Sequence, residues 1–269
     1  MSAPEKDMIW EDIRTHAEED ARKEPMLASF LYAVVLNHST LEDALSFLLA
    51  SKLESSTITA ASLRDLIDEA FAKDPKIPEA IREDIAAVCQ RDPACDGYAN
   101  ILMFYKGYHA LQAYRAAHYF WNEGRKSLAR YFQSRITEVF AVDIHPAAQI
   151  GHGILIDHAT SVVIGETAVV EDYVSMLHEV TLGGTGKRTG DRHPKVRRGV
   201  LISAGAKILG NVEVGEGAKI GACAVVLEDV APHTTVAGIP AKVVGVPKSD
   251  TPALEMDHRI DQSMTSAGL

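Results

Sequence analysis

An aliphatic residue returns every six positions in the second half of the chain, and this period limits the fold more than any other feature. The period slips by two residues after its third position and is interrupted after its seventh. Its thirteen positions are Ile144, Ile150, Ile156, Ile164, Val170, Met176, Leu182, Val196, Ile202, Ile208, Val214, Ile220 and Val226. A period of six fits neither an amphipathic helix nor a simple alternating strand, but it is typical of a parallel β-helix in which each hexapeptide forms one side of a triangular coil. We therefore expect three hexapeptides per coil with the aliphatic side chains stacked inside, whereas a β-sandwich would show alternating strands at irregular spacing.

A glycine directly follows the aliphatic residue at five of these positions. These glycines are Gly151, Gly165, Gly183, Gly215 and Gly221. Glycine suits a corner where a Cβ atom would clash or where φ must be positive. We expect all five to lie at corners of the coil.

The first 140 residues have a helical pattern instead. Apolar residues recur at spacings of three and four over 26–36, 41–53, 63–71, 77–88, 98–121 and 126–140;. The sequence therefore predicts an α+β protein with a helical N-terminal domain at 1–140 and a parallel β-helix at 141–247. The polar segment 248–269 has no periodicity and is predicted to be a flexible tail.

Charge and cysteine content exclude several classes of protein. The formal net charge of −10 gives no basic surface for nucleic acid or an anionic membrane;. The acidic N-terminus lacks the pattern of a signal peptide, and the longest apolar run, residues 30–36, is too short to span a bilayer;. Three cysteines without a CxxC pair indicate neither a disulfide framework nor structural zinc;. We expect a cytoplasmic protein in a reducing compartment.

The main departure from the hexapeptide pattern is residues 183–195, GGTGKRTGDRHPK. Insertions of this kind form loops on one face of a solenoid, often the binding face. The GTGK within it lacks the spacing and the Ser or Thr of a phosphate-binding P-loop. Arg192 beside His193 could clamp a small carboxylate with charge-assisted hydrogen bonds. A solvated basic loop is the alternative that the spacing leaves open.

His158, in the stretch IDHATS, is the candidate general base. Imidazole titrates near pH ~6.5 and is the natural base at neutral pH. Asp143 precedes it by fifteen residues. That is close to one coil of eighteen, so Asp143 is expected in the adjacent coil, where it could orient the imidazole. Asp157 suits this less well, because successive side chains of an extended segment point in opposite directions.

Metal and covalent mechanisms are not favoured. Five histidines lie in or near the repeat, namely His145, His152, His158, His178 and His193. The γ-class carbonic anhydrases hold zinc with an arrangement that includes His-x4-His, which this chain lacks, so no metal is expected. Cys223 has no nearby His and is predicted to be a buried structural thiol. If the protein is a transferase, the sequence therefore favours direct transfer of a group between two substrates, without a covalent intermediate on the protein.

Several stretches resemble bacterial serine O-acetyltransferase, the first committed enzyme of cysteine biosynthesis. They are DIHPAAQIGHGILIDHAT, VVIGETAVVEDYVSMLHEVTLGGTGKRTGDRHPKV and AGAKILGNVEVGEGAKIGACAVVL, together with EPMLASF, RDPA and KGYHALQAYR in the helical part. The resemblance covers nearly the whole chain up to the tail. It implies a left-handed β-helix that forms a trimer, with a dimer of trimers in many members. The implied reaction transfers acetyl from acetyl-CoA to the hydroxyl of L-serine.

The resemblance also implies roles for individual residues. His158 would be the general base and Asp143 its orienting carboxylate. Asp92 and Asp157 would hold the ammonium group of serine. The carboxylate would be held by Arg192 and His193. The residues expected to line acetyl-CoA are Gly184, Thr185, Ala204, Gly205, Lys219, Ala222 and Lys242, with the two lysines meeting its phosphates.

The resemblance further implies inhibition by L-cysteine, competitive with serine. The family's partner O-acetylserine sulfhydrylase captures a C-terminal Ile, whereas this chain ends in Leu269, so that complex is expected to be weaker or absent. Two alternatives remain at this stage. One is an O-acetyltransferase of another small acceptor such as a sugar, and the other is a β-helix scaffold without catalysis.

Overall fold

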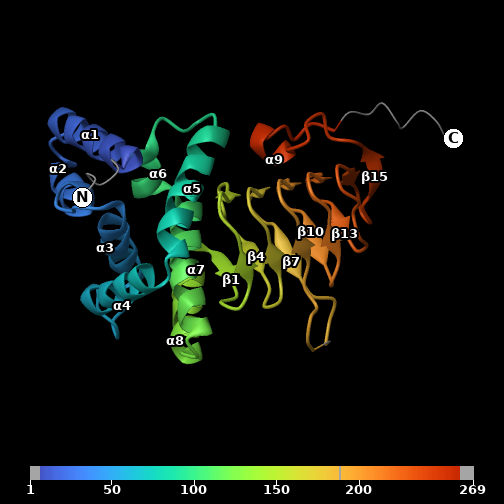
Figure 1. Ribbon diagram of the computed structural model, residues 1–269, viewed down its shortest axis with the longest axis horizontal. Coiled ribbons are helices and arrows are strands. Elements are labelled where there is room, and N and C mark those ends of the chain that lie inside the picture. The colour runs from blue at the N-terminus through green and yellow to red at the C-terminus, as the bar shows by residue number, and fades with distance from the viewer. Residues whose placement is uncertain (1–6, 188, 261–269) are drawn as a thin grey trace, which may run out of the picture.

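The computed structural model describes residues 7–187 and 189–260. In this part of the chain a helical domain is followed by a parallel β-solenoid that extends away from it (Figure 1). The helices are α1 (Met8–Lys23), α2 (Ala28–Leu31), the π-helix η1 (Tyr32–Leu36), α3 (Leu41–Leu53), α4 (Ala60–Lys73), α5 (Lys76–Arg91), α6 (Tyr98–Phe104), α7 (Lys106–Asn122) and α8 (Lys126–Phe140). Among the described residues, no helix is long and apolar enough to cross a membrane.

The helices match the predicted segments with two differences. The segment predicted at 98–121 is two helices, α6 and α7, because the backbone is extended at Tyr105 (φ −85°, ψ 100°). Helix α1 is not among the predicted segments. Only three of its residues, Trp10, Ile13 and Ala17, are buried, and half of its sixteen residues are charged, so it contains few apolar residues for a pattern to detect.

A buried histidine in α7 makes the stability of the helical domain depend on pH. His109 is 1% exposed, and its Nε2 atom lies 2.7 Å from the carbonyl oxygen of Leu102. Burial is the main cause that lowers the pKa of His109 to about 4;. The folded domain therefore excludes a proton that the unfolded chain binds near pH 6.5;.

We expect this histidine to lower the free energy of unfolding by as much as about 3 kcal/mol as the pH falls from 7 to 4. Its contribution is fully present above the unfolded pKa and is lost as the pH falls towards the folded one. In His109→Gln, whose amide can still donate to Leu102, this part of the pH dependence disappears. Urea unfolding of both proteins at pH 7 and pH 5 measures the difference, and an equal loss in both would contradict the assignment.

Fifteen short strands form three sheets in the described part of the chain. Sheet A contains, in spatial order, β1 (Val142–Ile144), β4 (Val162–Ile164), β7 (Thr181–Gly183), β10 (Lys207–Leu209) and β13 (Val225–Val226). Sheet B contains β11 (Glu213–Val214), β8 (Lys195–Val196), β5 (Val169–Val170) and β2 (Gln149–Ile150). Sheet C contains β15 (Lys242–Gly245), β14 (Thr235–Ala237), β12 (Lys219–Ile220), β9 (Leu201–Ile202), β6 (Ser175–Met176) and β3 (Leu155–Ile156).

The strand register confirms the coil predicted from the six-residue period. In sheet A, Val142 pairs with Val162, Val163 with Thr181, Thr181 with Lys207 and Lys207 with Val225, all in parallel. Successive coils are therefore 20, 18, 26 and 18 residues long. The extra residues of the third step are the loop that interrupts the period. Twelve of the thirteen aliphatic residues are buried, and Ile150 is half-buried.

The glycines that follow the aliphatic residues serve close packing between coils rather than an unusual backbone. None of the five described glycines has a positive φ. A Cβ atom on Gly151 would lie 2.2 Å from Asp172, one on Gly165 2.0 Å from His193, and one on Gly215 2.4 Å from Pro232. The expected clash of a Cβ atom therefore explains these glycines, whereas the expected positive φ does not.

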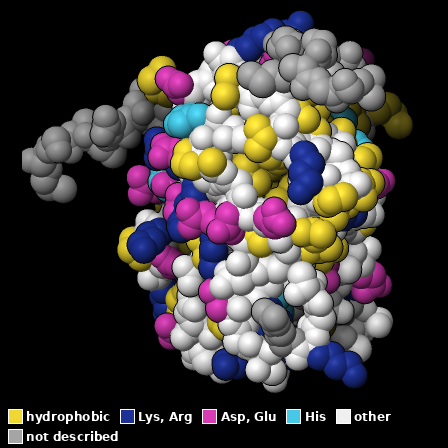
Figure 2. Space-filling view, turned by 90° about the vertical axis from the view of Figure 1, so that its right-hand side faces the viewer, with side chains coloured by type: hydrophobic (Ala, Val, Ile, Leu, Met, Phe, Trp, Pro, Cys, Tyr) yellow, Lys and Arg dark blue, Asp and Glu magenta, His cyan; other side chains and the backbone are white. Residues whose placement is uncertain are grey.

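The two ends of the solenoid are closed in different ways. Helices α7 and α8 cover the first coil, where Arg115 donates to the carbonyl oxygen of Gly151 and Gln133 to Asp143. At the far end β15 pairs antiparallel with β14. Figure 2, which views that end, shows apolar side chains on its surface. The large apolar residues near this end with at least half of their surface exposed are Leu227, Ile239, Val243 and Val246.

The segment after the solenoid was predicted to be flexible, and the structure gives its first part, up to Ile260, defined contacts with the solenoid. It contains the short helix α9 (Pro252–Glu255), in which Ala253 is fully buried. The segment packs over sheet C through polar contacts, such as the 2.9 Å contact of His258 Nδ1 with Ser203 Oγ. Such contacts leave no apolar periodicity in the sequence. Leu269 and the predicted sulfhydrylase contact lie outside the described residues.

Candidate active site

Three of the predicted site residues line one cleft of about 750 Å³ between the helical domain and sheet C. They are Asp92, Asp157 and His158. Asp92 ends α5, and the other two occupy the corner that joins β3 to β4. The helical domain therefore supplies part of the wall of a cleft whose other wall is a corner of the solenoid.

The corner turns through residues in the left-handed conformation, which directs His158 outward. His158, Ala159 and Ser161 have φ values of 56°, 60° and 61°. Non-glycine residues rarely adopt this conformation, and it is common at functional sites. The His158 side chain is 70% exposed, and its ring packs edge-on against His178 with 5.6 Å between centroids.

The carboxylate nearest to His158 is Asp157. Its Oδ2 atom lies 3.6 Å from Nε2 of His158. Asp157 thus lies on the same side as the imidazole, because the left-handed turn removes the alternation of an extended strand;. Asp143 instead accepts a 2.7 Å hydrogen bond from Gln133. Among the described residues, the expected contact between Asp143 and His158 within one chain is not found.

Asp92 is held in the cleft by its own loop. Its carboxylate accepts a 2.8 Å hydrogen bond from the backbone N–H of Ala94. Burial, and then the nearby Asp92 carboxylate, raise the pKa of Tyr105 to about 12, so its hydroxyl stays protonated beside Asp92;. Lys106, the first residue of α7, donates to Thr160 over 2.6 Å and ties this wall to the solenoid corner.

Several residues predicted to line acetyl-CoA follow His158 along the same edge of the solenoid. Ile156 pairs with Met176, Met176 with Ile202 and Ile202 with Ile220. Two positions further along, the register therefore aligns His158, His178, Ala204 and Ala222, and Gly205 lies next to this row. The edge carries small side chains beyond the two histidines, which leaves room for an extended ligand.

Cys223 also lies at this edge and is exposed, so its prediction as a buried thiol is wrong. It has a φ of 57° and occupies an outward position of the corner, where the inward aliphatic pattern has already ended.

A second group of predicted residues lies at a different corner, where sheet A leads into sheet B. The Arg192 guanidinium contacts the Glu166 carboxylate at 2.6 Å, and this hydrogen bond lowers the pKa of Glu166. His193 is only 7% exposed and contacts Thr167. Burial, and then the neighbouring Arg192, lower the pKa of His193;. This packed arrangement does not fit the alternative of a freely solvated basic loop.

The remaining predicted residues lie near these two corners or further along. Gly184 and Thr185 follow β7 and begin the loop that ends in the clamp of Arg192 and His193. Lys219 is 5% exposed and donates to the carbonyl oxygen of Arg259, so the segment after the solenoid engages its ammonium group. Lys242 is exposed in β15 at the far end.

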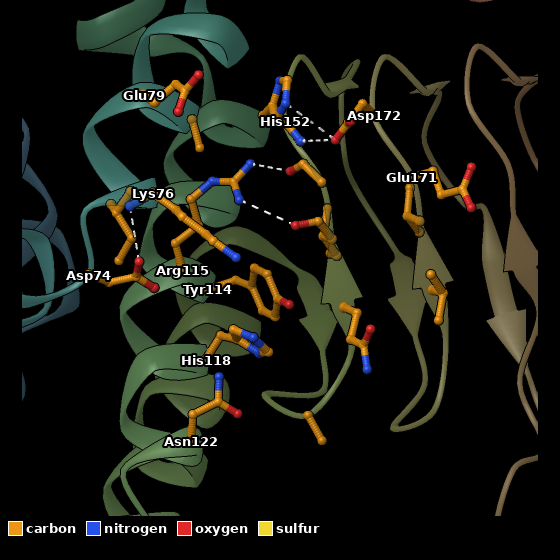
Figure 3. Close-up of a pocket in the computed structure, with 18 of the residues that line it drawn as sticks. Asp74, Lys76, Glu79, Tyr114, Arg115, His118, Asn122, His152, Glu171 and Asp172 are labelled. Carbon is orange, nitrogen blue, oxygen red and sulfur yellow. Dashed lines mark hydrogen bonds and ion pairs between the residues drawn. The ribbon is translucent and has the colours of Figure 1, made fainter.

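Another cleft, of about 860 Å³, separates α5 and α7 from β2 and β5 (Figure 3). None of the predicted site residues lines it. Figure 3 shows Arg115 reaching from α7 to the solenoid, where it bonds the carbonyl oxygen of Gly151 at 2.7 Å. Arg115 also pairs with the fully buried Asp84. These contacts fasten the helical domain to the first coil.

Four residues that contact the cleft or the clamp were not among the predicted site residues. They are Tyr105, Lys106, Glu166 and Thr167. Lys106 begins the KGYHALQAYR stretch, and Glu166 and Thr167 directly follow a glycine corner, so proximity to recognised motifs was the available signal. In the described ranges, no group of three His, Cys, Asp or Glu side chains is arranged to hold a metal ion.

Comparison with known proteins gives consistent matches over nearly the whole chain. Residues 9–113 match the family model "Serine acetyltransferase, N-terminal", and residues 193–228 match "Bacterial transferase hexapeptide (six repeats)". The serine acetyltransferase of Escherichia coli strain K12 is 54% identical over 97% of this chain and 96% of its own length.

Solved structures of serine acetyltransferases share the fold. A complex with cysteine has a TM-score of 0.91 and 54% identity, covering 93% of this chain and 98% of that one. The soybean enzyme complexed with serine has a TM-score of 0.88 and 56% identity, covering 90% and 100%. The Brucella abortus enzyme in complex with coenzyme A has a TM-score of 0.88 and 50% identity, covering 90% and 96%.

Proposed function

Since this chain belongs to the serine acetyltransferase family, we propose that it transfers the acetyl group of acetyl-CoA to the hydroxyl of L-serine, giving O-acetyl-L-serine and CoA in cysteine biosynthesis. One observation carries the proposal for this chain. His158 projects from a left-handed corner beside Asp157 into a cleft that also holds Asp92. An exposed base next to two carboxylates suits a substrate with a hydroxyl and an ammonium group.

The reaction moves one proton from serine to CoA by way of His158 and displaces one leaving group. His158 takes the proton of the serine hydroxyl as its oxygen attacks the thioester carbonyl carbon. The carbon–sulfur bond then breaks, and the proton passes to the sulfur of CoA. Asp157, 3.6 Å from Nε2, stabilises the imidazolium that forms;. Asp92 and Asp157 hold the ammonium group, while Arg192 and His193 hold the carboxylate.

The corner that carries Asp157 and His158 and the clamp of Arg192 and His193 are too far apart to bind one serine within a single chain. Strand β4 runs between the corner of His158 and the residues Glu166 and Thr167, which contact the clamp. From residue 161 to residue 166 the chain makes five steps of mostly extended backbone, which span about 15 Å, far more than the length of serine. We infer that the clamp of one copy meets the His158 corner of a second copy, and that Asp143 comes with the clamp.

A closed trimer satisfies this requirement, because each copy can offer one corner to each neighbour. Acetyl-CoA would then lie along the edge that carries Ala204, Gly205 and Ala222, with Gly184 and Thr185 of the neighbouring copy opposite. Exposed apolar side chains at the far end of the helical domain support a further contact between two trimers. They are Met26, Leu27 and Tyr32.

The function is tested by following thiol release from acetyl-CoA with L-serine, glucosamine or a galactoside as acceptor. We expect release with L-serine alone, and competitive inhibition by L-cysteine, which offers the same ammonium and carboxylate groups. Faster release with a sugar would favour another acceptor, and no release with any acceptor would favour a scaffold. An unchanged rate at low serine and saturating cysteine would contradict the inhibition.

A further inference from the structure

Thr167 makes four polar contacts with the two residues of the carboxylate clamp. Its hydroxyl oxygen accepts the backbone N–H of Arg192 at 3.0 Å and that of His193 at 3.1 Å. Its own backbone N–H donates to His193 Nδ1 at 3.1 Å, and its hydroxyl lies 2.9 Å from the same nitrogen. One side chain at the corner after β4 therefore holds both the backbone and the ring at the end of the inserted loop.

These contacts determine which nitrogen of His193 carries the proton. A backbone N–H can only donate, so His193 Nδ1 must present its lone pair to Thr167;. The two lone pairs of the Thr167 hydroxyl are occupied by the backbone N–H groups of Arg192 and His193, so its hydrogen is left for an acceptor, either His193 Nδ1 at 2.9 Å or the Asp191 carboxylate. A proton on Nδ1 would face the backbone N–H of Thr167. The ring is therefore neutral and carries its proton on Nε2.

The Nε2 edge lies on the side of the loop that the proposed function assigns to substrate. A Cβ atom on Gly165 would lie 2.2 Å from Nε2, and one on Gly184 would lie 3.7 Å from it. The ring thus packs over Gly165 and brings its N–H beside the start of the inserted loop. His193 is 7% exposed, so water cannot easily replace the Thr167 contacts.

We propose that Thr167 is a positioning residue that fixes His193 as a neutral Nε2–H donor for the carboxylate of the acceptor amino acid. The identity of the acceptor rests on the proposed function, whereas the state of the ring rests on the contacts alone. A neutral donor keeps the same hydrogen bond across the physiological pH range. The charge for the carboxylate then comes from Arg192.

The charged and titratable groups that face His193 come from four elements. Arg192 precedes it in the loop, Lys195 lies in β8, Glu166 follows β4 and His145 follows β1. Glu166 favours the protonated ring, while Arg192, Lys195 and His145 oppose it. The backbone N–H of Thr167 acts in the same direction as the cations and, unlike them, selects one nitrogen.

The test compares Thr167→Val, which keeps the branched shape and the backbone N–H but lacks the hydroxyl, with Thr167→Ser, which keeps the hydroxyl. Thr15→Val in helix α1 is the control for the substitution itself, because Thr15 is exposed and also uses its hydroxyl in a hydrogen bond. Histidine labelled with ¹³C and ¹⁵N reports the tautomer and charge of His193, whose signals are assigned with His193→Gln. Steady-state kinetics give KM for serine and for acetyl-CoA separately.

We expect His193 of the unaltered protein to remain in the Nε2–H form between pH 6 and 8. Thr167→Val loses the hydroxyl that holds the backbone N–H groups of Arg192 and His193, so we expect the ring to leave the remaining backbone N–H of residue 167 part of the time and to populate both tautomers. The KM for serine should rise about tenfold, the effect of losing a hydrogen-bonded orientation, with kcat and the KM for acetyl-CoA within about twofold. The Ser variant should restore the original spectrum and KM.

The spectra and the kinetics separate the proposal from the function on which it rests. A proton on Nδ1 in the unaltered protein, or an unaltered His193 spectrum in Thr167→Val, would overturn the proposal. An altered spectrum with an unchanged serine KM would support the positioning by Thr167 but refute the contact of His193 with serine. The spectrum of the unaltered protein decides the tautomer even if the Val variant does not fold.

Discussion

Replacement of His158 by asparagine is expected to lower kcat by about 10²- to 10⁴-fold, which is the usual contribution of a general base. Without the imidazole, the serine hydroxyl loses the base that takes its proton as the oxygen attacks. The substitution should preserve the fold, because asparagine tolerates the left-handed backbone that His158 adopts at a φ of 56°;. The KM for acetyl-CoA and the thermal midpoint are expected to change little.

The structure offers a matched control for this experiment. His233 is another exposed histidine with a positive φ, 51°, in the solenoid. His233→Asn makes the same chemical change in the same backbone conformation, away from the cleft. Activity equal to that of the original protein in this variant would assign the loss in His158→Asn to the missing base. A loss of less than tenfold in His158→Asn would contradict the role of His158.

Co-assembly of two inactive variants is expected to restore activity, because the proposed site takes one group of residues from each of two copies. His158→Asn damages the corner that carries the base, and the double variant Arg192→Ala with His193→Ala damages the clamp. In every mixed trimer, one of the three sites combines an intact corner with an intact clamp. The activity of mixed trimers should therefore rise from near zero to about a third of the original.

The measurement uses co-expression with two affinity tags, so that only mixed oligomers are assayed. The control pairs His158→Asn with Asp157→Asn. Both lesions lie at the same corner, no copy has that corner intact, and no recovery is expected. If the mixed oligomers of the first pair stay inactive while their composition is verified, the site is not shared between copies.

The sequence predicted the solenoid well because the same physical demand recurs at every inward position. Each aliphatic residue packs on its equivalent in the next coil, so the period survives the slip before Ile164 and the insertion before Val196. Helix α1 offered no such repetition, since it buries only three residues. The segment before Ile260 was read as mobile because it docks by polar contacts, such as that of His258 with Ser203, which have no sequence period.

The candidate site could be predicted as a list of residues but not as an arrangement. His158, Asp157 and Asp92 do meet, yet the left-handed turn that brings Asp157 to the imidazole leaves no clear mark in the sequence. The pairing of Asp143 with His158 was derived from a coil of eighteen residues, whereas the first coil contains twenty. Contacts between copies, which would bring Asp143 and the clamp to the base, cannot be read from one chain.

The register between coils has a consequence for how such a chain can tolerate insertions and deletions. Because three sides make one coil, removal of a single hexapeptide would keep every aliphatic residue inside but rotate all later edges by one third of a turn. The row from His158 to Ala222 would then be split between two different edges of the prism. The extra residues of the 20- and 26-residue coils avoid this, because they bulge outward and leave the later strands in phase. In this architecture, an insertion or deletion keeps the later residues on their original edges only if it is a whole coil or an outward bulge.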